Sequence, residues 1–245
     1  MKGSILTRTV DNREIYIYLP KGYDTSDKTY PVVYAHDGDK LMRFLKGIID
    51  EIEEGFTSGN LEEHIIVGIT PLDRLNEYTP WAAKSNHERF HDFEGQGDDY
   101  LEFLSGDLQD YIEREFRVSS RKEDRKIMGH SLGALISIYS AFKNNHYGKI
   151  ASICASQWYH NWIQFIREED LINENFKLMM IAGKKEGNGK ITIQKDTPKF
   201  SAMSYEIMRE RIGEENVELV WDEYDHHENL LNRHRIALAF LLRKD

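Results

Sequence analysis

The residues Gly129-His130-Ser131-Leu132-Gly133 match the pattern Gly-x-Ser-x-Gly, which is typical of a nucleophilic serine. In a nucleophile elbow the serine occupies a sharp turn between a strand and a helix, so that its hydroxyl is exposed. Residues 125–128 have the pattern of a strand and residues 132–142 that of a helix, which supplies this context. The alternative is a glycine-rich tight turn that holds an incidental serine. We favour Ser131 as a nucleophile, with the backbone N–H of Leu132 as one donor to the oxyanion that its attack would create.

A serine hydroxyl is a weak nucleophile at neutral pH and needs a base, which follows it in the chain after an acid. His226 and His227 come after the last expected strand, and we favour His227 because it lies nearer the next helix, with His226 as the alternative. His234 falls inside that helix and is expected to be solvated. For the acid we favour Glu186, which follows the strand near 176–182; the alternative, Asp196, precedes Thr197-Pro198 and is typical of a helix N-cap.

The second oxyanion donor is expected in the segment His36-Asp37-Gly38-Asp39-Lys40, which follows an early strand. Gly38 lets the backbone turn back toward the nucleophile, so the N–H of Asp39 or of a neighbour would donate. A second irregular segment, Pro71 to Gly97, spans 27 residues without clear periodicity. Loops of this length in compact domains are commonly functional. Since this one leaves the carboxyl end of a strand, we expect it to cover the active site.

A competing motif lies in that loop, because His87-Glu88-Arg89-Phe90-His91 matches the zinc-peptidase pattern His-Glu-x-x-His. The motif requires a buried amphipathic helix, whereas polar residues and glycines flank it here. Arg89 would also place a charge between the two ligands. We therefore expect a polar loop with solvated histidines and no metal site, and keep a zinc peptidase as the less favoured alternative.

Short apolar runs alternate with helical patterns along the rest of the chain, after a β-hairpin predicted around Asp11-Asn12. This alternation implies right-handed crossovers and a mainly parallel sheet with helices on both faces. No repeat or linker divides the sequence, so we expect a single domain over residues 1–245. The expected hairpin strands are 5–10 and 14–19; the later strands are 31–35, 64–70, 125–129, 149–155, 176–182 and 216–221; the main early helices are 40–54 and 98–116.

Composition excludes several classes of protein. Lys plus Arg number 32 and Asp plus Glu 42, so the net charge of −10 argues against a nucleic-acid partner. No apolar run approaches the about 18 residues of a membrane span, and the first twenty residues are unlike a signal peptide, so we expect a cytoplasmic protein without a membrane partner. Cys154 is the single cysteine, which excludes an internal disulfide. The oligomeric state is left open.

The sequence resembles the putative-esterase family of α/β-hydrolases. The resemblance rests on the segments 16–24 (YIYLPKGYD), 30–38 (YPVVYAHDG) and 99–104 (DYLEFL), together with the elbow at 129–133. That family includes enterochelin (siderophore) esterases, feruloyl and acetylxylan esterases, S-formylglutathione hydrolases and mycolyltransferase antigens. The resemblance covers nearly the whole chain, and the Asp37-Gly38 turn is most similar to the siderophore-esterase branch. It implies the α/β-hydrolase fold.

The resemblance also implies roles for individual residues. Ser131 would be the nucleophile and a histidine at the position of His227 its base, whereas the acid, commonly Asp, is here Glu186. The segment 74–80 (RLNEYTP) is similar to a loop that lines the active site in the siderophore-esterase branch. The substrate-binding candidates are Gly38, Arg74, Trp81, His130 and Trp158.

The sequence thus favours a serine carboxylesterase that hydrolyses a small-molecule ester of the aryl, cinnamoyl or siderophore type through an acyl-enzyme, without a cofactor. Acyl transfer to an alcohol in place of water stays open. The alternative from another class is a catalytically silent α/β-hydrolase that acts as a binding module.

Overall fold

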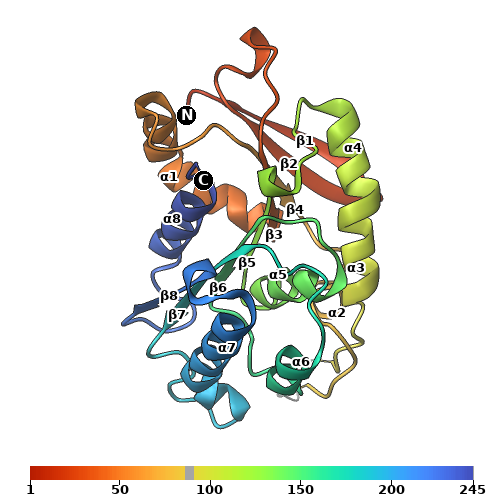
Figure 1. Cartoon of the computed structure of the whole chain (residues 1–245), viewed down its shortest axis with the longest axis vertical. Helices are drawn as coiled ribbons and strands as arrows, with labels where there is room; N and C mark the ends of the chain where they lie inside the picture. The colour runs from red at the N-terminus through yellow and green to blue at the C-terminus, as the bar shows by residue number, and fades with distance from the viewer. Residues whose placement is uncertain (86–90, 245) are drawn as a thin grey trace.

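The computed structural model describes residues 1–85 and 91–244, and all of its named strands belong to one sheet (Figure 1). The sheet has eight strands in the order β1-β2-β4-β3-β5-β6-β7-β8. β1 pairs with β2 and β2 with β4 in antiparallel fashion, and every later pairing is parallel. The strands are β1 (Ser4–Val10), β2 (Arg13–Leu19), β3 (Val32–His36), β4 (Ile65–Ile69), β5 (Arg125–His130), β6 (Lys149–Ile153), β7 (Lys177–Gly183) and β8 (Val217–Asp222).

The structure confirms the predicted hairpin and the predicted strands. Each observed strand end lies within two residues of the predicted end. Asp11 and Asn12 both have positive φ, 46° and 60°, which is the backbone of a two-residue turn whose twist suits a hairpin. Every residue of β3, β4 and β6 is buried. Continuous burial is what parallel strands covered on both faces require, and it explains why β3 and β4 are mostly apolar without alternation.

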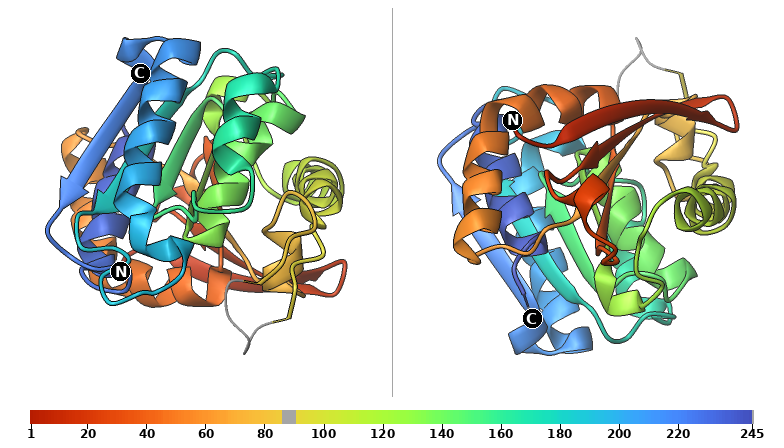
Figure 2. Two further views of the ribbon diagram at one scale, coloured as in Figure 1. Left: turned by 90° about the horizontal axis from the view of Figure 1, so that it is seen from below. Right: turned by 90° about the horizontal axis from the view of Figure 1, so that it is seen from above.

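Helices cover both faces of the sheet (Figures 1 and 2). On one face α1 and α8 pack against the strands around Leu45 and Leu238, and on the other α3 to α7 pack around Leu104, Leu135 and Trp162. The helix expected over 98–116 is a continuous helical stretch in which a π-helical segment, Leu104–Leu108, joins α3 to α4. The helices are α1 (Gly38–Ser58), α2 (Arg74–Glu77), α3 (Gly97–Phe103), α4 (Gln109–Glu115), α5 (Leu132–Lys143), α6 (Trp162–Glu168), α7 (Thr197–Ile212) and α8 (Leu230–Leu241).

At the carboxyl ends of the parallel strands, backbone hydrogen bonds continue beyond the strands themselves. The N–H of Ser131 donates to Ile153 O at 2.9 Å, that of Cys154 to Ile181 O at 2.7 Å, and that of Lys184 to Asp222 O at 2.8 Å. The residues that leave the sheet at this edge are therefore fixed to the neighbouring strand before their loops begin. Within the described ranges, no helix combines the length and apolar character needed to cross a bilayer.

Candidate active site

The strand–turn–helix geometry around Ser131 is that of a nucleophile elbow. Ser131 lies between β5 and α5 with φ 61° and ψ −117°, a conformation that costs a non-glycine residue about 1–3 kcal/mol. A Cβ at Gly129 would lie 2.4 Å from the carbonyl carbon of Gly133, so the close approach of strand and helix requires glycine there. The sequence prediction of an elbow is confirmed in its geometry.

A chain of hydrogen bonds joins Ser131 to a buried carboxylate through His226. The Ser131 Oγ lies 3.0 Å from His226 Nε2, and His226 Nδ1 lies 2.7 Å from Glu186 Oε2. The Glu186 side chain is 1% exposed and that of His226 is 23% exposed. Glu186 Oε1 also accepts the N–H of Gly183 at 2.7 Å, so both carboxylate oxygens are engaged. With Nδ1 donating to Glu186, Nε2 is the nitrogen left to accept the serine proton.

The histidine in this chain is His226, and the preference for His227 from the sequence is corrected. The turn before α8 decides between them: Arg233, fully buried and paired with Asp222, donates to the carbonyl oxygens of Asp225 and His226 at 3.0 and 3.4 Å. These contacts direct the His226 ring to Ser131, while the His227 ring lies edge-on to it at 4.7 Å. Nearness to the following helix, on which the sequence preference rested, does not control these side-chain directions.

Of the two candidate acids, only Glu186 contacts the histidine. Asp196 ends a short 3₁₀ helix and occupies the N-cap position of α7, as the sequence indicated, but its side chain makes no capping bond. The carboxylate that contacts the histidine therefore belongs to the turn directly after β7, and the backbone N–H of Glu186 donates to Gly183 O at 3.2 Å.

We expect Glu186→Gln to lower kcat/KM for an aryl ester by about 10³–10⁴-fold without loss of folding. The glutamine oxygen can keep the bond to Gly183 N–H, which turns the amide NH₂ toward His226 Nδ1 and favours the tautomer whose Nε2 cannot accept a proton. Steady-state kinetics and thermal unfolding measure the two quantities. Asp196→Asn is the matched control and should leave kcat/KM within about twofold of wild type, as expected of a surface change; an equal loss in both variants would contradict the assignment.

The two helix N-termini expected to donate to an oxyanion lie side by side. α1 begins at Gly38 and α5 at Leu132, so the N–H groups of Gly38, Asp39 and Leu132 belong to first turns, which lack intrahelical acceptors. A Cβ at Gly133 would lie 3.7 Å from Asp37 Oδ2, which shows how closely the two turns approach. The donor roles of Asp39 and Leu132 stay predictions.

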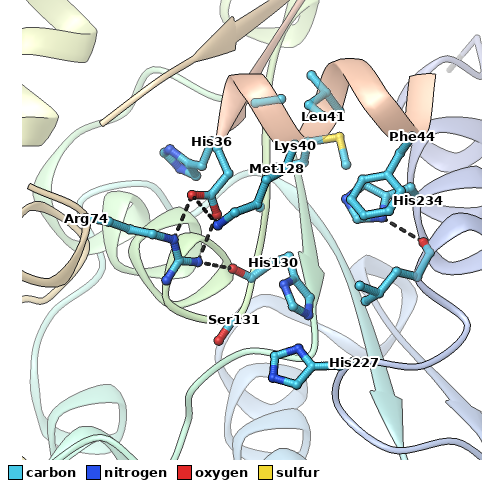
Figure 3. Close-up of a pocket in the computed structure, with 14 residues that line it drawn as sticks. His36, Lys40, Leu41, Phe44, Arg74, Met128, His130, Ser131, His227 and His234 are labelled. Carbon is cyan, nitrogen blue, oxygen red and sulfur yellow. Dashed lines mark hydrogen bonds and ion pairs between the residues drawn. The ribbon is translucent and has the colours of Figure 1, made fainter. Parts of the chain in front are cut away.

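Arg74, which the sequence analysis proposed as a substrate ligand, is bonded to two protein groups, one before each helix. Its Nε and one terminal nitrogen donate to the Asp37 carboxylate at 2.7 and 2.8 Å, and the same terminal nitrogen donates to His130 O at 3.2 Å (Figure 3). Asp37 has φ 55° and precedes α1, so this ion pair stabilises a left-handed residue at the start of the helix. Gly38 is likewise structural, since a Cβ there would lie 2.6 Å from the backbone of Gly68.

A cleft of about 350 Å³ opens at Ser131. Phe93 and Trp158 give it aromatic walls, and Ser156 places its Oγ 3.3 Å from that of Ser131. Trp81, the other expected pocket residue, lies instead in an aromatic cluster with Tyr159 and Phe165 and does not line the cleft; its indole N–H donates to His160 O. Among the described residues, the cleft is also lined by Arg74, Leu75, Ser85, Leu132, Glu186, Gly187, Lys190, Gln194, Thr197, Asp225, His226 and His227.

A second cavity, of about 210 Å³, lies between His130 and α8 (Figure 3). His234 lines it and is buried rather than solvated, stacked on Phe44 with ring centroids 4.1 Å apart; burial lowers its pKa to about 4. Burial also lowers the pKa values of His130 and His227, so these three imidazoles are uncharged beside His226 at neutral pH. The burial of His234 could not be predicted, because a single histidine in a helical pattern does not reveal that Phe44 stacks on it.

The His-Glu-x-x-His segment lies outside the described residues except for its last member, His91, which is exposed. The long loop itself contains α2 and a β-bridge between Ala83 and Phe93, and it contributes Arg74, Leu75 and Phe93 to the cleft.

The chain is similar to several known proteins. A family model described as "Putative esterase" matches residues 7–170. The uncharacterized protein YbbA of Bacillus subtilis (strain 168) is 35% identical over 212 residues, which cover 86% of this chain and 84% of that protein. An IroE-like serine hydrolase from Shewanella oneidensis superposes with a TM-score of 0.82 at 17% identity, covering 98% of this chain and 80% of that one. Siderophore hydrolase EstA from Aspergillus nidulans superposes with a TM-score of 0.73 at 17% identity, covering 98% and 94%. At such identities a superposition establishes a shared fold.

Proposed function

Because the chain belongs to the putative-esterase family and has the α/β-hydrolase fold, we propose that it hydrolyses a small carboxylic ester through an acyl-enzyme on Ser131. Ester hydrolysis in general follows from the family. The serine mechanism rests on one observation, the continuous hydrogen-bond chain from Ser131 through His226 to Glu186.

In the proposed mechanism, Ser131 Oγ attacks the ester carbonyl carbon while His226 Nε2 takes the hydroxyl proton. Glu186 stabilises the imidazolium that forms, and backbone N–H groups at the starts of α1 and α5 donate to the oxyanion. His226 then gives the proton to the leaving alcohol. Water attacks the acyl-enzyme with His226 again as base, which releases the acid and restores Ser131.

The walls of the cleft support an aromatic ester of the aryl, cinnamoyl or siderophore type. Phe93 and Trp158 offer flat apolar surfaces to a ring, and the cavity of about 350 Å³ is of the size of ordinary ligand sites. Phe93 and Leu75 come from the segment 71–97, so this loop covers part of the cleft in the proposed enzyme. The polar residues Lys190 and Gln194 also line the cleft and would face the more polar part of the substrate.

A fluorophosphonate probe tests the proposal directly, because it reacts with a serine only when a neighbouring base activates the hydroxyl. We expect labelling of the purified protein at Ser131, located by mass spectrometry of peptides, with EDTA causing no loss. Denatured protein is the control and should give no adduct. A folded protein that stays unlabelled would favour the silent binding module, and labelling abolished by EDTA would contradict a metal-independent serine mechanism.

A further inference from the structure

Three metal-ligating side chains meet beside the proposed active site at the carboxyl edge of the sheet. His130 ends β5, Cys154 directly follows β6, and His226 follows β8. One ligand atom from each residue lies within 4.8 Å of the other two. Neighbouring parallel strands end at the same edge, which brings together three residues that are far apart in sequence.

The Cys154 side chain is held in place by its backbone. Cys154 has φ 50°, a left-handed conformation that is uncommon for a residue other than glycine, and its N–H donates to Ile181 O. The residue is 1% exposed. Burial, and then the nearby Glu186 carboxylate, raise the pKa of the thiol, so it is protonated in the metal-free protein. The ester-hydrolysis mechanism does not use this thiol.

We propose that His130, Cys154 and His226 form an inhibitory site for a thiophilic divalent cation such as Zn²⁺. A thiolate and two imidazoles are a ligand set that zinc prefers, with bond lengths of about 2.3 Å to sulfur and about 2.0 Å to nitrogen. Ligands at those lengths lie about 3.3–3.5 Å apart in a tetrahedral site, so the side chains must each shift by about 1 Å or less. Binding displaces the thiol proton to solvent and leaves one position on the metal for water.

The metal would inhibit because His226 cannot ligate it and act as base at the same time. Both His226 nitrogens are already in use, Nδ1 toward Glu186 and Nε2 toward Ser131, so ligation breaks one link of the chain on which the mechanism depends. We expect the metal to enter past His226, the ligand that lines the cleft and is partly exposed, since His130 lines the second cavity and Cys154 is buried. The inhibitory effect therefore rests on the serine mechanism proposed above, whereas binding of the metal does not.

Cobalt spectroscopy tests the site without relying on activity. A thiolate bound to Co²⁺ gives a charge-transfer band in the near ultraviolet. Because Cys154 is the single cysteine of the chain, this band reports binding at the proposed site, whereas Co²⁺ bound only to some of the ten histidines would not give it. We expect the band in the wild-type protein, its disappearance in Cys154→Ser and Cys154→Ala, and its displacement by Zn²⁺. Retention of the band in His227→Gln, the adjacent imidazole outside the cluster, is the matched control. No band in the folded wild-type protein, or loss of the band in His227→Gln, would overturn the proposal.

Inhibition supplies the second readout. Zn²⁺ should inhibit wild-type ester hydrolysis reversibly, with recovery on adding EDTA, and Cys154→Ser should require about 10–100-fold more Zn²⁺, since even the loss of outer-shell partners changes metal affinity by that factor. Mg²⁺, which prefers oxygen ligands, should have no effect. Equal zinc sensitivity in wild type and Cys154→Ser would overturn the inhibitory role. If the protein gives the cobalt band but has no esterase activity, the result would support the metal site and would contradict only the proposed function.

Discussion

Replacing His226 with alanine is expected to lower kcat/KM by about 10⁵–10⁶-fold, while His227→Ala is expected to lower it by less than about tenfold. The two residues are adjacent in sequence, and both line the cleft. In the described part of the chain, however, the only imidazole nitrogen that is hydrogen-bonded to Ser131 Oγ is His226 Nε2, at 3.0 Å. Without it no group takes the hydroxyl proton. Steady-state kinetics on one aryl ester measures both variants.

The comparison of the two histidines is internally controlled, because both substitutions remove an imidazole from the same turn. A general loosening of the turn would lower both rates together. Fluorophosphonate labelling of Ser131 should follow the same order, rapid in His227→Ala and absent in His226→Ala. The reverse order of the two variants would show that the turn before α8 rearranges and that His227 is the base after all.

Ser131→Ala is expected to lower kcat by about 10⁶-fold, to a residual rate supported by the oxyanion donors and substrate binding alone. Alanine keeps the Cβ and the backbone bond to Ile153 O, and among the described residues the hydroxyl that it removes is hydrogen-bonded to His226 and Ser156. We therefore expect the melting temperature to change little, and the variant to bind ester substrate without turning it over.

Measuring the binding of substrate to the Ser131→Ala variant separates the loss of a nucleophile from a disturbed cleft. An inactive variant that also fails to bind substrate would indicate a disturbed cleft rather than a missing nucleophile. Turnover close to the wild-type rate would contradict the serine mechanism. Ser131→Gly is a useful companion because it relieves the left-handed backbone, with φ 61°, while also removing the hydroxyl; it should be as inactive and at least as stable.

The sheet and the elbow could be predicted from sequence because the physical signals are local. The apolar runs at β3 and β4 reflect burial on both faces, and the glycines of the elbow reflect close backbone contact. Glu186 could be predicted as well, since chain order places an acid in the turn after β7 and few carboxylates are available there.

The direction of individual side chains could not be predicted, because contacts distant in sequence decide it. Arg233, buried in α8, selects His226 over His227 through backbone carbonyls that no residue pattern reveals. Trp81 was expected in the pocket because of the resemblance to the putative-esterase family, yet aromatic partners from α6 hold it elsewhere. Arg74 does line the cleft, but no residue pattern reveals that its guanidinium is bonded to Asp37, which lies 37 residues earlier.

Backbone hydrogen bonds extend the parallel pairing past the ends of β5 and β6, and they link unfolding of the candidate active site to unfolding of the sheet. The amide hydrogens of Ser131 and Cys154 are tied into the buried centre of the sheet. Groups of this kind exchange with solvent only when the whole cooperative unit opens. We therefore expect the amide of Ser131 to be among the slowly exchanging groups of the molecule, and heat or denaturant to disrupt the geometry around Ser131 in the same event that melts the sheet.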